Sequence, residues 1–338
     1  ELSWLDVPPD AAYQQAITTL QLCGAAFVTE ECQIQLTPHG VRLAQMPLHP
    51  RLAHMLLVGC DIHATETACL LAAILSERNP LSSRGVDLGA TVSVLMGEER
   101  CPDELQAWFK RTWNQARRYA RLASEIHKPR KFALDGGQDD ILGILLASAY
   151  PDRIARLRPG GEGIRYQLSN GRSAVIRKGD ALAGSEWLAV AEVGGTAGDS
   201  EDVIYSATAL DPESFNDILS TLVNDDDQVE WDHRNERFIA EKHRKVGKIV
   251  LSIDPLDEVS SEVKSRALMG VIQKKGLSIL PWSPNLIQWR QRITLMHQLH
   301  SDSVDNPWPD MSDEKLLDTI DDWLLPYLDG VNNLKDFQ

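Results

Sequence analysis

The spacing of apolar residues changes near residue 150 of this 338-residue chain. Before that point, apolar residues recur every three or four positions over long stretches, which is typical of amphipathic helices. After it, short runs rich in Val, Ile, Tyr and Trp alternate with glycine-containing turns, which is typical of strands. At roughly 100–200 residues per domain, the length predicts two to four domains. We therefore predict a multidomain α+β protein.

The helical half contains two regions. In residues 1–50, a helix that ends at Gly24 is followed by two short strands within residues 26–36. A second helix begins at Thr37-Pro38, where a hydroxyl cap precedes a proline. This order fits a winged-helix module. Residues 51–150 are predicted to form a helical bundle, in which a long helix over residues 103–126 carries apolar residues on one side and arginines on the other.

The strand-rich half also divides in two. Strand-like runs cover residues 164–168, 174–178, 187–193 and 203–208. Asn170-Gly171 lies between the first two runs and is the strongest short-range hairpin signal in the chain. We predict a small β-barrel of the OB type over residues 151–211. Residues 212–338 are expected to form a mixed α/β domain, with strands between residues 229 and 253 and helices over residues 261–274, 285–300 and 313–325.

Known catalytic and metal-binding motifs are missing from the sequence. It contains no phosphate-binding loop of the G-x-x-x-x-G-K-[ST] type, no H-E-x-x-H and no G-x-S-x-G. The five cysteines include no C-x-x-C pair, so we expect no metal site and assign no catalytic residue. The longest apolar run, Ala68 to Leu75, has eight residues, and residues 1–6 lack the basic start and apolar core of a signal peptide. We expect a cytoplasmic protein without a membrane span.

Charge is strongly segregated along the chain. The net charge is −15, yet residues 110–131 contain eight Lys or Arg against one acid, Glu125. Residues 301–338 contain ten acids against Lys315 and Lys335. A second basic stretch, Arg234 to Lys248, is interpreted as a partner of this acidic tail. The Asp225–Asp227 run has the ligands of a hard-cation site but is interpreted as a solvated turn. A basic segment with so few acids is suited to neutralising phosphates, although a solvated helix face is the ordinary alternative.

Nucleic-acid binding is therefore the leading hypothesis. OB-type strand faces often contact single strands, so basic residues of the predicted barrel are added to those of the basic segment. The predicted contacts are Arg117, Arg118, Arg121, Lys128, Arg130, Lys131, Arg172 and Lys178. The alternative is a non-enzymatic protein-interaction module, in which the acidic C-terminal third, with Trp308, Trp323 and Tyr327 exposed, docks a protein partner. A third possibility is that the tail folds over the basic segment and blocks it.

Several motifs resemble the region that follows the motor domains in DEAH-box helicases. LSWLDVPP at residues 2–9 resembles the segment after the second motor domain, and LTPHGVRLA at residues 36–44 resembles the winged-helix signature L-T-x-x-G-x-x-L-A. PLHPRLAHML at residues 47–56 resembles the entry to the ratchet bundle, with His49 where the family usually has Asp. LSERNPL at 75–81, with Asn79 in place of an expected Asp, RFIAEK at 237–242 and PWPDMSDE at 307–314 are similar to the bacterial HrpB-type branch.

The resemblance implies an ATP-dependent helicase that acts on RNA. Two RecA-like motor domains are expected before Glu1 and a continuation after Gln338, so ATP and Mg²⁺ would be bound by the motor domains and not by this chain. The winged helix, a ratchet-like bundle over residues 51–150 and the OB-like barrel would form one wall of a nucleic-acid channel. The expected partners are single-stranded nucleic acid, RNA by the resemblance, and the motor domains in the same polypeptide.

Overall fold

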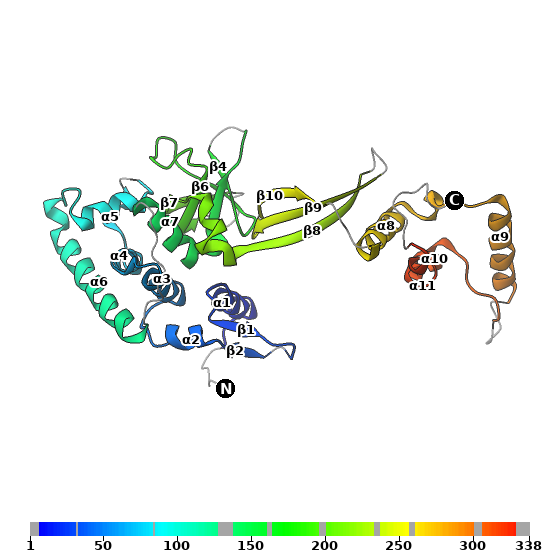
Figure 1. The fold of residues 1–338 in the computed structure, drawn as a ribbon, viewed down its shortest axis with the longest axis horizontal. Coiled ribbons are helices and arrows are strands. Elements are labelled where there is room, and N and C mark those ends of the chain that lie inside the picture. The colour runs from blue at the N-terminus through cyan, green and yellow to red at the C-terminus, as the bar shows by residue number, and fades with distance from the viewer. Residues whose placement is uncertain are drawn as a thin grey trace. The chain divides into compact units, whose positions relative to one another are not determined.

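A computed structural model describes residues 7–31, 33–83, 85–127, 138–160, 164–195, 201–232, 237–256, 261–300 and 306–328. The chain forms two compact units (Figure 1). The first comprises residues 1–224 and 246–249, and the second comprises residues 225–245 and 250–338. The helices formed by the described residues are each too short or too polar to span a bilayer.

The first unit begins with a helix, a two-stranded antiparallel sheet and a second helix. α1 (Asp10–Leu22) precedes β1 (Ala26–Val28) and β2 (Ile34–Leu36), and α2 (Pro38–Leu43) follows. The Thr37 side chain accepts a hydrogen bond from the Gly40 backbone N–H at 2.9 Å, so the predicted hydroxyl cap is confirmed. The order of elements predicted for residues 1–50 is therefore found in the structure.

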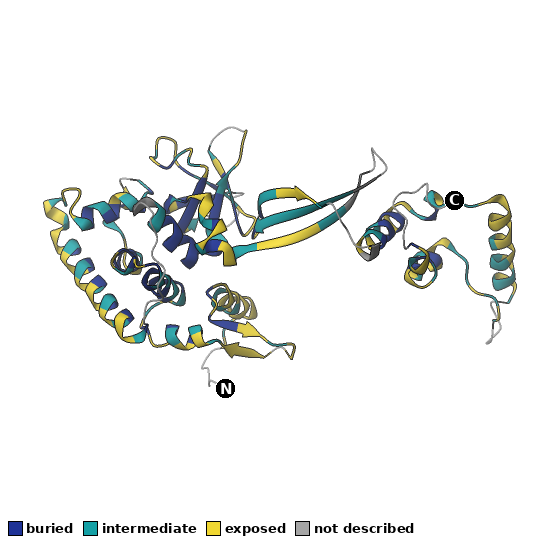
Figure 2. Cartoon of the chain, in the orientation of Figure 1, coloured by how far each residue is buried: buried dark blue, intermediate teal, exposed yellow. Residues whose placement is uncertain are grey.

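Five helices form the bundle that follows. They are α3 (Pro50–Asp61), α4 (Thr65–Ser76), α5 (Leu88–Met96), α6 (Gln106–Ile126) and α7 (Gln138–Ala149). α4 is apolar almost all round, and its residues from Thr67 to Ile74 are buried (Figure 2). α3 and α6 pack against it, whereas α7 packs against α3 and the barrel strands β6 and β7. The bundle therefore leaves one face of α6 exposed to solvent.

A closed five-stranded barrel completes the main part of the first unit. Its strands are β3 (Ile154–Leu157), β4 (Arg165–Leu168), β5 (Ser173–Val175), β6 (Trp187–Gly194) and β7 (Asp202–Ala209), in the order β3-β4-β5-β7-β6. Asn170-Gly171 forms the predicted turn between β4 and β5, where Gly171 has a φ of 92° that favours glycine. Tyr166, Leu188 and Val190 are among the side chains that fill the barrel.

A three-stranded sheet follows the barrel in sequence. It consists of β8 (Val223–Asp232), β9 (Arg237–Val246) and β10 (Ile249–Pro255), in the order β10-β9-β8. Asp225 lies in β8 and accepts from Lys242 Nζ in β9 at 2.7 Å, and Asp226 accepts from Lys245 Nζ at 2.8 Å. The acidic run is therefore part of a strand, and the interpretation as a solvated turn was wrong. These lysines pair with β8, because strand pairing brings together two oppositely charged segments.

The second unit contains the remaining helices, α8 (Ser261–Lys275), α9 (Pro284–Leu299), α10 (Asp313–Asp318) and α11 (Ile320–Trp323). Leu268, Ile272 and Ile320 are at the centre of its core. The single helix predicted over residues 313–325 is interrupted at Thr319, and Pro326 lies in a short 3₁₀ turn because it cannot donate to an α-helical ladder. Trp323 packs against this core and donates to the Leu316 carbonyl, so it is not the exposed residue predicted, whereas Tyr327 is 78% exposed.

Short 3₁₀ segments connect the larger elements of both units. Their bounds are Pro80–Ser83, Asp103–Leu105, Pro151–Arg153, Pro212–Asn216, Ile218–Leu222, Leu277–Ile279 and Leu325–Tyr327.

Candidate nucleic-acid interface

The long helix α6 has one buried face and one basic face. Its buried residues recur every three or four positions, so they form a single stripe against α3 and α4. They are Trp108, Thr112, Ala116, Tyr119 and Ala123. All five cations of the helix are exposed on the remaining surface, and we call them the α6 cationic face. They are Lys110, Arg111, Arg117, Arg118 and Arg121.

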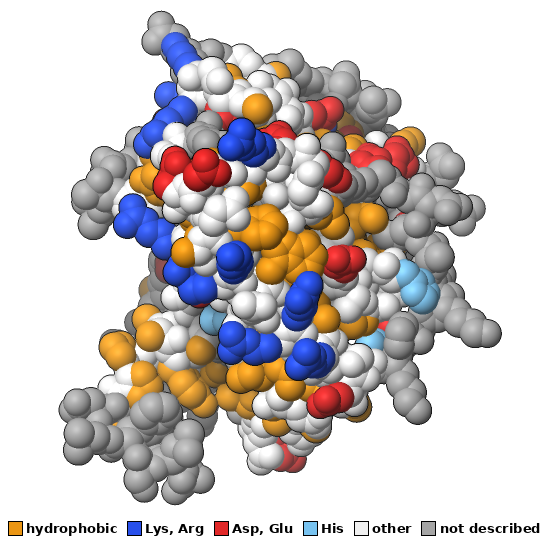
Figure 3. Space-filling view, turned by 90° about the vertical axis from the view of Figure 1, so that its left-hand side faces the viewer, with side chains coloured by type: hydrophobic (Ala, Val, Ile, Leu, Met, Phe, Trp, Pro, Cys, Tyr) orange, Lys and Arg blue, Asp and Glu red, His pale blue; other side chains and the backbone are white. Residues whose placement is uncertain are grey.

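The α6 cationic face is little neutralised by neighbouring acids. Within the described part of the chain, one of these five residues forms an ion pair, Arg111 with Glu77 at 3.8 Å. The Arg117 guanidinium carbon lies 5.7 Å from the centre of the Trp113 ring, which holds it by a cation–π contact. From Lys110 to Arg121 the helix rises by roughly 16 Å. Figure 3 shows basic side chains around an exposed apolar patch on this side of the molecule.

Two predicted contacts lie on the barrel and not on this helix. Arg172 follows the β4–β5 turn, and its Nη2 donates to Asp202 Oδ1 at 2.7 Å. The Asp202 side chain is only 6% exposed, so it neutralises Arg172 in a fixed geometry. The structure therefore gives Arg172 a structural partner that lies 30 residues away and that the sequence did not indicate.

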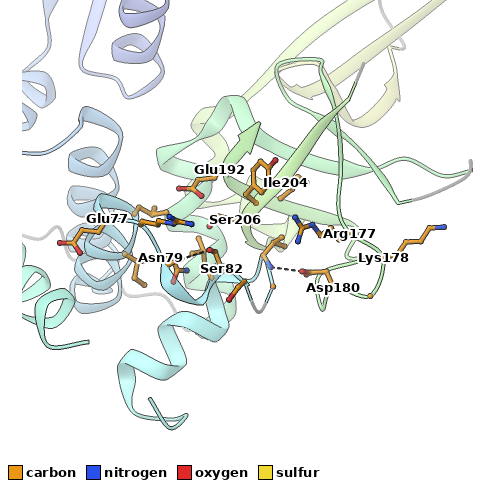
Figure 4. Close-up of a pocket in the computed structure, with 18 residues that line it drawn as sticks. Glu77, Asn79, Ser82, Arg177, Lys178, Asp180, Glu192, Ile204 and Ser206 are labelled. Atoms are coloured by element: carbon orange, nitrogen blue, oxygen red, sulfur yellow. Dashed lines mark hydrogen bonds between the residues drawn. The ribbon is translucent and has the colours of Figure 1, made fainter. Parts of the chain in front are cut away.

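Lys178 lines a cavity of about 570 Å³ between the end of α4 and the barrel (Figure 4). Its side chain points away from the other labelled residues. The cavity has acids and bases in similar numbers, and the Asp180 carboxylate accepts from the Val86 backbone N–H at 2.9 Å. A lining of mixed sign is less suited to a polyanion than the α6 cationic face is. Lys128, Arg130 and Lys131 lie outside the described residues.

A second hollow adjoins the α6 cationic face and was missed in the sequence analysis. It has a volume of about 440 Å³, and we call it the α4–α6 pocket. It is lined by Thr65, Glu66, Cys69, Leu70, Trp113, Ala116, Arg117 and Ala120. Trp113 donates its Nε1–H to the Leu95 carbonyl at 2.8 Å, which fixes the indole ring. One feature of the sequence could have indicated this pocket. Ala116 and Ala120 are two small residues one helical turn apart, close to Trp113 on the same helix.

The α4–α6 pocket is mainly apolar. Burial raises the pKa of the Cys69 thiol to about 12, with smaller contributions from Cys60 and Glu66, so the thiol stays neutral at physiological pH. Glu66 is exposed at the rim and is the one carboxylate of the lining. Among the described residues, no group of three or more His, Cys, Asp or Glu side chains could hold a metal ion.

Comparisons with known proteins show that the chain is similar to RNA helicases. A family profile described as "ATP-dependent RNA helicase HrpB, connector region" matches residues 222–256, which include the strands β8, β9 and β10. The chain is 31% identical over 337 residues to the ATP-dependent RNA helicase HrpB of Escherichia coli K12. This match covers 99% of this chain and 38% of that protein. A segment of 74 residues is 39% identical to the DExH-box ATP-dependent RNA helicase DExH1 of Arabidopsis thaliana, which amounts to 22% of this chain and 7% of that protein.

Solved structures give the same result. The crystal structure of the E. coli DExH-box NTPase HrpB matches 99% of this chain with a TM-score of 0.64 and 31% identity. A second crystal structure, of the E. coli DEAH/RHA helicase HrpB, matches the whole chain with a TM-score of 0.63 and 29% identity. In both matches the chain spans 38% of the length of the solved protein.

Proposed function

We propose that this chain, an HrpB-type helicase C-terminal region, is an accessory part that holds single-stranded nucleic acid on the α6 cationic face. The observation that carries the proposal is the exposed row of five cations, which has Glu77 as its one acidic partner among the residues that the structure describes. Each phosphate that such a cation neutralises releases a counterion, and this release favours binding at low salt. Both E. coli and Arabidopsis relatives are described as RNA helicases, so RNA is the expected strand.

The proposal divides the work between this chain and the rest of the longer protein. The motor domains would bind ATP and Mg²⁺ and supply the force, whereas this chain would guide the strand. Residues 1–50 would act as a winged helix, 51–150 as a ratchet-like bundle and 151–211 as an OB-like barrel, with 212–338 as a further α/β domain. The helix–sheet–helix order, the bundle and the closed barrel support these assignments.

The test is the salt dependence of binding to a labelled single-stranded RNA of about 15 nucleotides. Each neutralised phosphate adds about −0.7 to the slope of log affinity against log salt concentration. Replacing Arg117, Arg118 and Arg121 by Glu is therefore expected to reduce the slope by about 2 and to abolish measurable binding at moderate salt. The readout is fluorescence anisotropy between about 50 and about 200 mM salt.

A control variant carries the same change of charge elsewhere. Lys274, Lys275 and Arg292 are exposed on α8 and α9, and their replacement by Glu also lowers the net charge by six. This variant is expected to keep most of the affinity and the full slope. Equal losses in the two variants would show that only total charge matters. Absence of binding by the unmodified chain at low salt would refute the proposed function.

A further inference from the structure

The α4–α6 pocket lies directly beside the α6 cationic face, because Arg117 belongs to both. We propose that this pocket receives one unpaired nucleobase of the strand whose phosphates lie on the cationic face. The inference rests on the proposed function and adds to it a contact with the base itself. It predicts that binding depends on bases as well as on phosphates.

The size and lining of the pocket fit a flat aromatic ring. Its volume of about 440 Å³ lies within the range of small-molecule sites, which is about 300–1,000 Å³. Ala116 and Ala120 are one turn apart on α6 and leave the space open beside Trp113. Leu70 and the neutral Cys69 thiol are buried beneath it and close its floor from the side of α4. The partly exposed Trp113 and Ala120 therefore form the apolar surface that a base can contact.

The pocket offers stacking partners that are already in position. The hydrogen bond from Trp113 to the Leu95 carbonyl fixes the indole, so little rotamer freedom is lost when a ligand stacks on it. The Arg117 guanidinium lies 5.7 Å from the centre of that ring and presents a second planar, cationic surface. Stacking of a base on an aromatic side chain contributes about 1–3 kcal/mol in alanine-substitution experiments.

Charge favours a base over an apolar side chain of a protein partner as the occupant. A strand held by Arg117 and its neighbours has its phosphates at the rim of the pocket, so a base attached to the same backbone can reach it. Glu66 at the rim can accept a hydrogen bond from the exocyclic amine of a base such as cytosine. A neutral peptide side chain would use neither the cations nor this carboxylate.

The deciding experiment compares two oligomers with equal numbers of phosphates. One is an oligocytidine of about 15 nucleotides, and the other is an oligomer of abasic sites of the same length. We expect the unmodified chain to bind the oligocytidine at least about fivefold more tightly, the lower end of one stacking contact. Ala120→Leu fills the pocket without altering any charge, and is expected to lower the affinity for oligocytidine to near that for the abasic oligomer.

A matched variant and the abasic oligomer separate the possible failures. Ala107→Leu adds the same side chain at an exposed position of α6 that does not line the pocket, and should change neither affinity. Equal binding of both oligomers by the unmodified chain, or unchanged oligocytidine binding by Ala120→Leu, overturns the nucleobase site and leaves the phosphate contacts intact. Failure of the unmodified chain to bind either oligomer at low salt overturns the proposed function itself. A loss of abasic binding in Ala120→Leu would mean that the helix is disturbed, and Trp113→Ala then replaces it, because it removes the proposed stacking surface without altering any charge. Unchanged oligocytidine binding by Trp113→Ala overturns the nucleobase site, whereas a loss of about fivefold or more supports it.

Discussion

His54 is held in its neutral form by its surroundings. Its Nδ1 lies 2.8 Å from Nε2 of His39, and the two rings meet edge to face at 87°. Burial, and to a smaller degree the adjacent His39, lower the pKa of His54 to about 4. The pair joins α2 to α3, so the protonation of one residue affects how the N-terminal elements attach to the bundle.

This pKa predicts that the first unit becomes less stable in mild acid. Between pH 6.5 and about 4 the unfolded chain binds a proton at His54 and the folded chain does not, so the free energy of unfolding falls as pH falls. The expected loss between pH 7 and pH 5 is about 2 kcal/mol. In His54→Gln, the pH dependence should be weaker by this amount, as measured by urea unfolding at both pH values. Identical pH profiles of the two proteins would contradict the prediction.

At the scale of an element, α2 depends on Thr37 and Gly40. The Thr37 hydroxyl accepts from the Gly40 N–H at 2.9 Å and donates to the Gly24 carbonyl at 2.6 Å, so it both caps α2 and ties it to the end of α1. A Cβ on Gly40 would lie 2.0 Å from the Ala25 carbonyl oxygen, so only glycine permits this approach of α2 to β1.

Thr37→Val keeps the shape of the side chain and removes the hydroxyl. We expect a loss of about 1–2 kcal/mol, because both the helix cap and a hydrogen bond to the backbone disappear. Faster amide hydrogen exchange in residues 39–43 of α2 should report it. Thr37→Ser retains the hydroxyl and should restore most of the protection. Equal exchange rates in the Val and Ser variants would show that the hydroxyl does not stabilise α2.

At the scale of the molecule, the chain has two units with separate cores. The barrel core contains Leu188, and the core of the second unit contains Leu268, both fully buried. Each unit therefore has its own hydrophobic stabilisation, and unfolding is expected to occur in two transitions. The net charge of the chain is −15, yet the surface formed by the five exposed cations of α6 is positively charged.

Substitution of one core at a time tests this division. Leu188→Ala is expected to lower the transition of the first unit, and Leu268→Ala that of the second, each by about 2–5 kcal/mol. Calorimetry of the whole chain would show one transition moving while the other stays. A single transition that both variants shift equally would mean that the two units unfold together.

Local patterns were sufficient to predict much of the fold. The helical order of the first 150 residues, the cap at Thr37, the hairpin at Asn170-Gly171 and the basic face of α6 all follow from residues close together in sequence. A helix or a tight turn depends on neighbours within a few positions, so its signal is visible without knowledge of the rest of the chain.

Contacts between distant residues were decided by tertiary structure alone. The pairing of Arg172 with Asp202, of Lys242 with Asp225, and the closure of the barrel by β3 and β6 join segments that no local pattern relates. The α4–α6 pocket likewise requires Glu66 and Trp113 to meet across two packed helices. The sequence by itself therefore determined which side of α6 is basic. Packing decided which of the predicted cations already have an acidic partner, and it placed the α4–α6 pocket beside the α6 cationic face. The physical reason is that charge pairing and cavities depend on distances in space, which periodicity along the chain does not encode.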